Sequence, residues 1–263
     1  MLPVRDDNPT RHKPVVTVVV MVLCAVAYLL WQPSPFGRTN ADVTFNLRHA
    51  AIPLEIRQGD PLTNCQVFTA YSSRVQAAQV CSSTDRDASF ASGKQPYLAV
   101  LTSLFLHGSL VHLGGNLLFL WIFGNNVEDR LGRVRYIVFY LMAGVVATIA
   151  HVMVNASSAE TLVGASGAIA GVMGAYLVWF PRVKITTAIF FVIFVRLRAW
   201  VLLAVWFVLQ FFTNASSNVA WVAHVAGFVF GALVGLLFRG DVHGPQPVLE
   251  PVSWPPPPSS TGP

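Results

Sequence analysis

Residues 199–238 have the sequence AWVLLAVWFVLQFFTNASSNVAWVAHVAGFVFGALVGLLF, which contains no Asp, Glu, Lys or Arg. An apolar helix of about 20 residues crosses the ~30 Å hydrocarbon core of a bilayer. The polar cluster Asn214–Asn218 favours a turn, and it divides this run into two spans, 199–213 and 219–238. The stretch therefore predicts a helical membrane protein.

The composition of the whole chain agrees with this prediction. Of the 263 residues, 54% are hydrophobic and 11% are charged, and the mean hydropathy is +0.57. Charged residues make up about a quarter of a soluble globular domain, so these values exclude a soluble or a disordered chain. Three cysteines are too few for a disulfide-stapled secreted module. In a membrane protein, the positions of the basic residues behind the net charge of +5 determine how the spans are oriented. We therefore expect a lipid bilayer and no nucleic acid as a partner.

Four further spans are predicted from intervals that lack charged residues. They cover residues 15–31, 109–127, 136–155 and 165–181, and the second begins after the polar His107-Gly108-Ser109. The 11-residue interval Ile185–Val195 is too short to cross a bilayer and indicates an interfacial or buried segment. The expected fold class is therefore an all-α polytopic membrane protein with a bundle of six transmembrane helices.

The positions of Lys and Arg predict the orientation, because short segments rich in these residues lie on the cytoplasmic side. Basic residues precede the first span, follow the sixth, and join spans two and three and spans four and five. We therefore expect a cytoplasmic N-terminal segment (1–14), a membrane domain (15–240) with a long outer loop (32–96), and a Pro-rich disordered cytoplasmic tail (241–263). The expected location is the cell membrane, with both termini cytoplasmic.

Two features leave alternatives open. The first apolar run is either a retained span or a signal peptide cleaved near Ala25-Val26-Ala27. A retained span is favoured because the run continues to Trp31, which suits a membrane interface. In the outer loop, Cys65 and Cys81 form either a disulfide, which is favoured, or two free thiols.

A few polar residues fall within the predicted spans, where burial in lipid is costly unless the residue has a partner or a task. His112 and Asn116 are spaced i and i+4 in span two, Ser166 opens span four, and His224 lies in span six. Spans two, four and six run in the same direction. At ~1.5 Å per helical residue, these side chains lie within about 5–11 Å of the outer ends. We expect one common layer.

Small residues predict which spans approach one another. Gly167 and Gly171 form a G-x-x-x-G pattern, as do Gly227 and Gly231. Such patterns let helix backbones come close in lipid. His224 shares a helix face with Gly227 and Gly231, so close packing on span four would bring its imidazole to Ser166.

This set of residues suggests a Ser-His dyad. No Asp or Glu falls within a span, so no carboxylate is expected at this depth as a third member. His224 would act as the general base for Ser166, and His112 and Asn116 would stabilise an oxyanion, with no metal and no cofactor required. Taken singly, each residue also fits packing or a helix-to-helix hydrogen bond, and paired histidines could ligate haem.

Three ordered motifs resemble those of a known family. They are His107-Gly108-Ser109-Leu110-Val111-His112-Leu113-Gly114-Gly115-Asn116, then Gly164-Ala165-Ser166-Gly167, then Ala223-His224-Val225-Ala226-Gly227 followed by Gly231. Over residues 97–239 the sequence resembles the rhomboid intramembrane serine proteases. The resemblance implies a six-helix core around a water-filled cavity. It also implies Ser166 as nucleophile, His224 as base, and His112, Asn116 and the Ser166 amide as oxyanion donors.

The resemblance implies cleavage of single-span membrane proteins near the outer face. The sequence differs from the family pattern in the outer loop. The family often has a Trp-Arg pair there, whereas residues 32–96 contain no Trp. A catalytically silent rhomboid-like protein that binds membrane helices is the alternative, and a haem-binding electron carrier using His112 and His224 is the third possibility. The presence of both Ser166 and His224 favours the protease.

Overall fold

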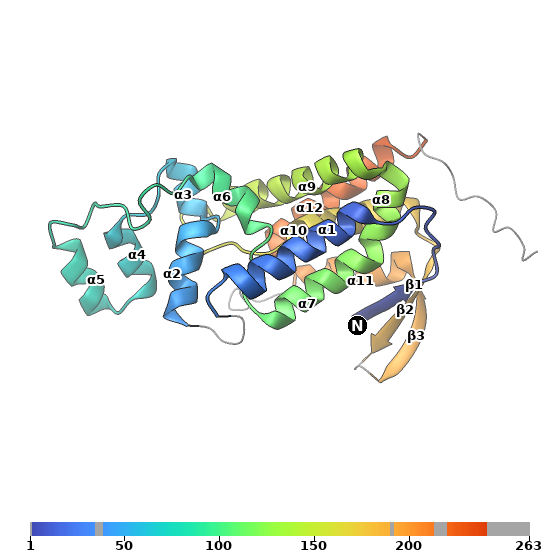
Figure 1. The fold of residues 1–263 in the computed structure, drawn as a ribbon, viewed down its shortest axis with the longest axis horizontal. Helices are drawn as coiled ribbons and strands as arrows, with labels where there is room; N and C mark the ends of the chain where they lie inside the picture. Colours follow the sequence, from blue (N-terminus) through green and yellow to red (C-terminus); the bar gives the residue numbers. More distant parts are fainter. Residues whose placement is uncertain (1, 35–38, 190–191, 213–219, 241–263) are drawn as a thin grey trace, which may run out of the picture.

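The fold consists of a helical bundle with a smaller helical unit at one end and a sheet at the other (Figure 1). The computed structural model describes residues 2–34, 39–189, 192–212 and 220–240. The predicted tail, 241–263, therefore lies outside the described residues. The predominantly helical architecture is confirmed, whereas the sheet was not predicted.

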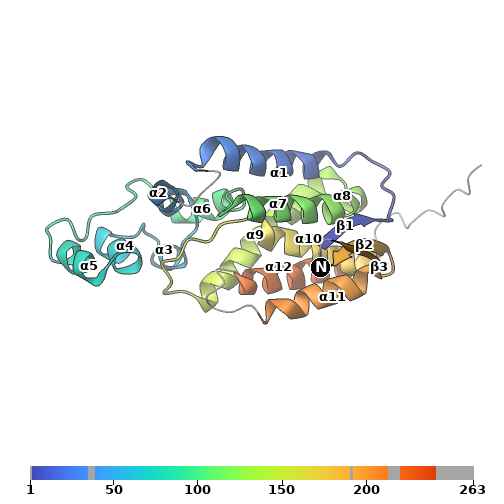
Figure 2. The same cartoon turned by 90° about the horizontal axis from the view of Figure 1, so that it is seen from below.

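The bundle contains six apolar helical rods among the described residues, and in both views they run side by side (Figures 1 and 2). Their bounds are α1 (Val15–Val26) continued by the π-helix η1 (Ala27–Trp31), α7 (Leu110–Phe119) continued by the π-helix η2 (Leu120–Gly124) and α8 (Asn125–Leu131), α9 (Arg133–Val154), α10 (Ser166–Trp179), α11 (Ala199–Gln210), and α12 (Trp221–Leu237). Two of them, Leu110–Leu131 and Arg133–Val154, are long and apolar enough to cross a membrane; the other four are shorter apolar helices.

Helix α10 lies at the centre of the bundle. Every residue from Gly167 to Tyr176 is buried, and the helix packs against α9 and α12. Its contact with α12 is backbone against backbone. A Cβ atom added to Gly227 would overlap the carbonyl oxygen of Gly167, and one added to Gly231 would overlap that of Gly171. The four glycines singled out in the sequence therefore meet at one helix crossing, where no side chain fits between the two backbones.

The N-terminus of α1 is capped by a residue from α8. No side chain next to α1 caps it, but the Glu128 carboxylate accepts hydrogen bonds from the backbone N–H groups of Val16 (2.9 Å) and Thr17 (2.7 Å). These groups have no partner within their own helix, and a carboxylate also suits the positive end of the helix dipole. Glu128 thus joins the first helix to the second rod of the bundle.

Three antiparallel strands form a sheet at the other end of the bundle from the small helical unit (Figure 1). They are β1 (Leu2–Asp6), β2 (Lys184–Ile189) and β3 (Ile193–Arg198), in the order β1-β2-β3. The expectation of an all-α chain is corrected here in two places. Residues 185–189 and 193–195 lie in the paired strands β2 and β3, as their β-branched and aromatic residues favour, and the N-terminal segment contributes the strand β1.

Residues 40–103 form the small helical unit at the opposite end. Its helices are α2 (Asn40–His49), α3 (Pro53–Gln58), α4 (Asn64–Tyr71), α5 (Arg74–Cys81) and α6 (Pro96–Ser103). A disulfide between Cys65 and Cys81 joins α4 to α5. Lys94 and Glu55 form a buried ion pair of 2.5 Å, and the two groups also bond the Leu47 carbonyl and the Leu62 N–H. The segment predicted as a loop is therefore a folded unit with a small core of its own.

Substituting Gly231 by Ala should destabilise the bundle. The added methyl would overlap the Gly171 backbone, and overpacking of this kind costs about 1–3 kcal/mol or more. Thermal unfolding of the purified protein in detergent measures the effect. Gly114→Ala is the matched control, because nothing lies within 4 Å of its added Cβ. Equal melting temperatures for the two variants would contradict the packing described.

Docking of β1 should weaken as the pH rises through about 6. Burial raises the pKa of Asp6 from 3.8 to about 6, although its carboxylate accepts hydrogen bonds from Tyr176 (2.9 Å) and Asn126 (2.6 Å). Between pH 3.8 and about 6, Asp6 binds a proton more tightly in the docked strand than in the free strand. The free energy of docking is therefore most favourable below pH 3.8, weakens as the pH rises, and becomes constant above about 6.

Hydrogen exchange of the β1 amides at pH 5 and pH 8, corrected for intrinsic rates, measures this dependence. Asp6→Asn cannot ionise and should abolish the difference between the two pH values. Equal protection of the wild-type strand at both pH values would show that Asp6 does not control docking.

Candidate active site

Ser166 and His224 form a hydrogen-bonded pair between the first turns of two helices. Ser166 is the first residue of α10, and its Oγ lies 2.8 Å from Nε2 of His224 in α12. The glycine crossing of α10 and α12 brings them together. The pair has the geometry of a nucleophile and its base.

Gly164 shapes the turn that leads into Ser166. Its φ of +123° is a conformation that residues with a side chain rarely adopt. A Cβ at this position would also lie 2.8 Å from Cε1 and 2.9 Å from Nε2 of His112. The glycine two residues before the serine is therefore needed for the backbone conformation and for the close approach of the imidazole.

His112 and Asn116 line the same cavity from α7. The backbone N–H of Gly108 donates a hydrogen bond to Nδ1 of His112 (3.4 Å), so the ring proton lies on Nε2, on the side of the ring that faces Gly164. Asn116 is buried, and within the part of the chain that the structure describes its Nδ2 has no hydrogen-bond partner. Two N–H donors are thus available beside the Ser166 turn. A buried donor without a partner is costly unless a ligand accepts from it.

The four residues singled out in the sequence all line one cavity of about 850 Å³. Asn46 and Tyr71 of the small helical unit reach its lining, as does the segment 160–164. A cavity of this size can hold a short extended peptide segment and water. Glu160 also lines this cavity. The sequence predicted no carboxylate at the depth of Ser166 and His224, so an acidic residue lies nearer to the site than expected.

The sequence prediction missed Gln210, the last residue of α11. Its Oε1 lies 2.8 Å from Nδ1 of His224, and its side chain is buried. The Trp206 ring, one helical turn earlier, packs beside the same imidazole with 5.9 Å between the ring centroids. A carboxylate is the usual third member beside a Ser-His pair, whereas this chain places an amide there, and Gln210 is visible in the sequence as a polar residue within the apolar run 199–213.

Both ring nitrogens of His224 are therefore engaged, one by Ser166 and the other by Gln210. Neither is left for a haem iron, which argues against the electron-carrier interpretation. Among the described residues, no three His, Cys, Asp or Glu side chains are grouped so that they could hold a metal ion.

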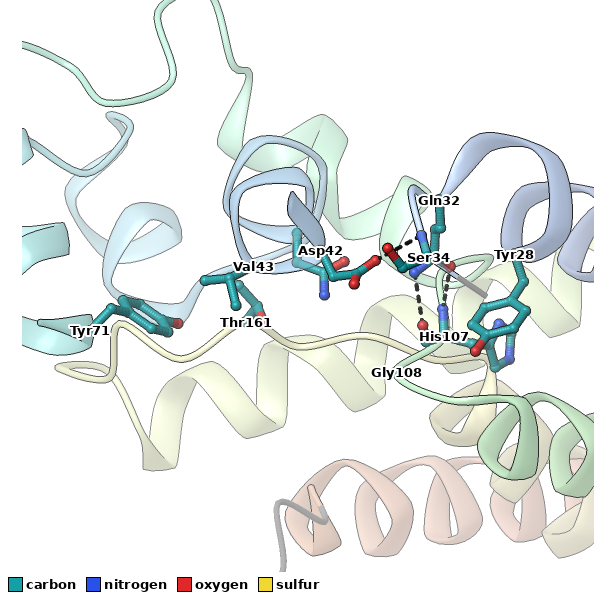
Figure 3. Close-up of a pocket in the computed structure, with 10 residues that line it drawn as sticks. Tyr28, Gln32, Ser34, Asp42, Val43, Tyr71, His107, Gly108 and Thr161 are labelled. Carbon is teal, nitrogen blue, oxygen red and sulfur yellow. Dashed lines mark hydrogen bonds between the residues drawn. The ribbon is translucent and has the colours of Figure 1, made fainter. Parts of the chain in front are cut away.

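A second, small polar pocket of about 60 Å³ adjoins the cavity beneath α2 (Figure 3). In it, Gln32 clamps the backbone of His107, donating to its carbonyl (2.8 Å) and accepting from its N–H (2.9 Å). Asp42 also lines the pocket. Burial raises the pKa of Asp42, but hydrogen bonds from Thr39 and Ser34 outweigh this effect and lower the pKa below its usual value. The carboxyl group is therefore ionised at neutral pH. The two hydrogen bonds between Gln32 and the His107 backbone hold the chain just before α7, the helix that carries His112.

Comparison with known proteins agrees with these motifs. A family model described as the rhomboid domain matches residues 94–241. Rhomboid protein 1, mitochondrial, of Saccharomyces cerevisiae is 29% identical over 152 residues, which is 52% of this chain and 41% of that protein. Rhomboid protease GluP of Bacillus subtilis is 40% identical over 78 residues, 30% of this chain and 15% of that protein.

A mitochondrial relative from Bos taurus, presenilin-associated rhomboid-like protein, is 33% identical over 85 residues, 32% of this chain and 22% of that protein. Each of these matches spans less than half the length of the relative. The family model covers more than half of the chain and includes all three motifs around the cavity. The chain belongs to the rhomboid family of integral membrane proteins.

Proposed function

We propose that the chain is an intramembrane serine endopeptidase that cleaves transmembrane segments of single-span membrane proteins with a Ser166–His224 pair. The observation that carries this proposal is the 2.8 Å contact between Ser166 Oγ and His224 Nε2 inside a cavity that is also lined by two N–H donors. The name of the Bacillus relative, a rhomboid protease, supports it.

In the first step His224 Nε2 takes the proton of Ser166 as Oγ attacks the scissile carbonyl carbon. The negative charge that develops on the carbonyl oxygen is stabilised by the Ser166 amide, His112 Nε2–H and Asn116 Nδ2–H. The Ser166 amide lies at the N-terminus of α10, where it has no partner within the helix and the dipole favours an anion.

His224 then gives its proton to the leaving amine, and the C–N bond breaks to leave an acyl ester on Ser166. A water molecule attacks this ester, with His224 again as the base, and the second product leaves with the carboxylate. The cavity can hold the water that this step consumes.

We further propose that the six rods span the cell membrane, with both termini cytoplasmic and the cavity open to the outer side. The placement of basic residues at the 130–135 and 182–198 connections supports this orientation. The 14 residues of α10 extend about 21 Å, less than the ~30 Å hydrocarbon core. Ser166 would therefore lie below the outer surface, and the irregular backbone leading to it lines the cavity, as non-helical chain within a membrane requires.

A substrate helix must unwind before its carbonyl can reach Ser166, because a helical carbonyl is already hydrogen bonded and shielded. Substrates with Gly or other helix-destabilising residues at the cleavage site should therefore be preferred. A catalytically silent protein that holds membrane helices would have the same cavity. What favours the protease is that the nucleophile, the base and the oxyanion donors are all present together.

Ser166→Ala should abolish cleavage of a model single-span substrate in proteoliposomes and labelling by a fluorophosphonate probe. Both reactions require the hydroxyl as nucleophile. Ser158→Ala is the control, because its hydroxyl accepts a hydrogen bond from the nearby Glu160 N–H and the residue does not line the cavity. Cleavage and labelling that persist without the Ser166 hydroxyl would overturn the protease assignment. A folded wild-type protein that neither cleaves nor is labelled would favour the silent protein.

His112→Ala and Asn116→Ala should each lower kcat by about 10²–10³-fold with little change in KM, because an oxyanion donor acts mainly in the transition state. Steady-state kinetics with the same substrate separate the two constants. A rise in KM at unchanged kcat would instead assign these side chains to substrate binding.

A further inference from the structure

The contact between Gln210 and His224 has a defined direction. Gln210 donates from Nε2 to the backbone carbonyl of Trp206, at 3.0 Å. A carbonyl can only accept, so the amide nitrogen must face Trp206 and the amide oxygen must face His224. The position of the oxygen thus follows from a backbone group one turn earlier in the same helix.

The amide oxygen in turn determines the tautomer of His224. Oε1 can only accept, so the imidazole must carry its proton on Nδ1, 2.8 Å away. Nε2 is then left with a lone pair, and this is the nitrogen that lies 2.8 Å from the Ser166 hydroxyl. With the opposite tautomer, Nε2 would be a donor and could not take the serine proton.

We propose that Gln210 is a positioning residue that holds His224 in the tautomer and orientation needed to deprotonate Ser166, a role that rests on the proposed function. The chain would then have a Ser-His-Gln arrangement with a neutral third member. An Asn has the corresponding place beside the His of papain-like cysteine proteases.

The surroundings of Gln210 explain why an amide suits this position. The side chain is 7% exposed and lies between α11 and α12, where an ionised carboxylate would lose its hydration. A neutral amide fixes the ring at a smaller cost of burial. Trp206 covers the imidazole from the same face of α11, so one helix supplies both contacts that orient the base.

Gln210→Leu removes the acceptor from a side chain of similar size. We expect kcat for the model substrate to fall about 10- to 100-fold, less than the full 10²–10⁴-fold contribution of a general base, with KM within about twofold. Gln210→Glu keeps an oxygen acceptor in either protonation state, and it should recover kcat to within about tenfold of the wild type. A loss due to misfolding alone would not be recovered in this way.

Gln32→Leu is the matched control for stability. Gln32 is also a buried glutamine with both amide atoms hydrogen bonded, at 7% exposure, but it contacts His107 and not His224. Thermal unfolding of both Leu variants shows the cost of losing a buried amide. Only Gln210→Leu should change the state of His224.

Nitrogen NMR of the histidine-labelled protein at a pH where His224 is neutral reads the tautomer directly, with His224→Ala identifying the signal. We expect the proton on Nδ1 in the wild type and a shift toward Nε2–H in Gln210→Leu. A wild-type His224 protonated on Nε2, or a tautomer unchanged by Gln210→Leu, overturns the proposal.

The kinetic outcomes distinguish the two assignments. If Ser166→Ala is inactive but Gln210→Leu has the wild-type kcat, the protease assignment stands and the positioning role is wrong. If the wild-type protein shows no Ser166-dependent cleavage or labelling, the proposed function and the positioning role are both wrong, whatever the tautomer.

Discussion

The direct contact between the backbones of α10 and α12 is the constraint on which the site depends. Gly227 and Gly231 lie against the carbonyl groups of Gly167 and Gly171, so the two helices come closer than side chains would allow. Ser166 and His224 lie just before this contact, in the first turns of the same two helices. The 2.8 Å separation of Oγ and Nε2 is therefore set by packing along the helices, and any widening of the crossing would separate the pair.

The histidine of the candidate site is held by uncharged polar groups. His224 has one partner at each ring nitrogen, and both partners are neutral. The Asn116 Nδ2 donor is one of several buried polar atoms that have no partner among the described residues, and Asn116 belongs to the cavity wall. An unsatisfied buried donor has an energetic cost that a developing oxyanion would relieve. The unsatisfied Asn116 donor thus agrees with the oxyanion role proposed for it.

Polar contacts stabilise the two ends of the bundle. At one end, Glu128 and Asp129 bind backbone N–H groups near the start of α1, and Asp6 brings β1 against the ends of α8 and α10. At the other, the disulfide-linked helical unit reaches the cavity lining through Asn46 and Tyr71. The hydrogen bonds at both ends join residues more than 80 positions apart, so they form only when the chain folds.

The amino-acid sequence by itself determined the helical class, the approximate bounds of the apolar helices and the glycine patterns, and it pointed to four residues that line one cavity. These are local properties, because charge-free length, helical periodicity and motif spacing depend on neighbouring residues alone. Only the tertiary structure decided the rest. The pairing of β1 with β2 joins Asp6 to Ile185, and the contact of Gln210 with His224 depends on how α11 packs beside α12. No local pattern specifies such pairings, since they arise from which surfaces meet when the bundle forms. The sequence shows an amide in the apolar run 199–213, but only the packing of α11 on α12 shows that this amide meets His224.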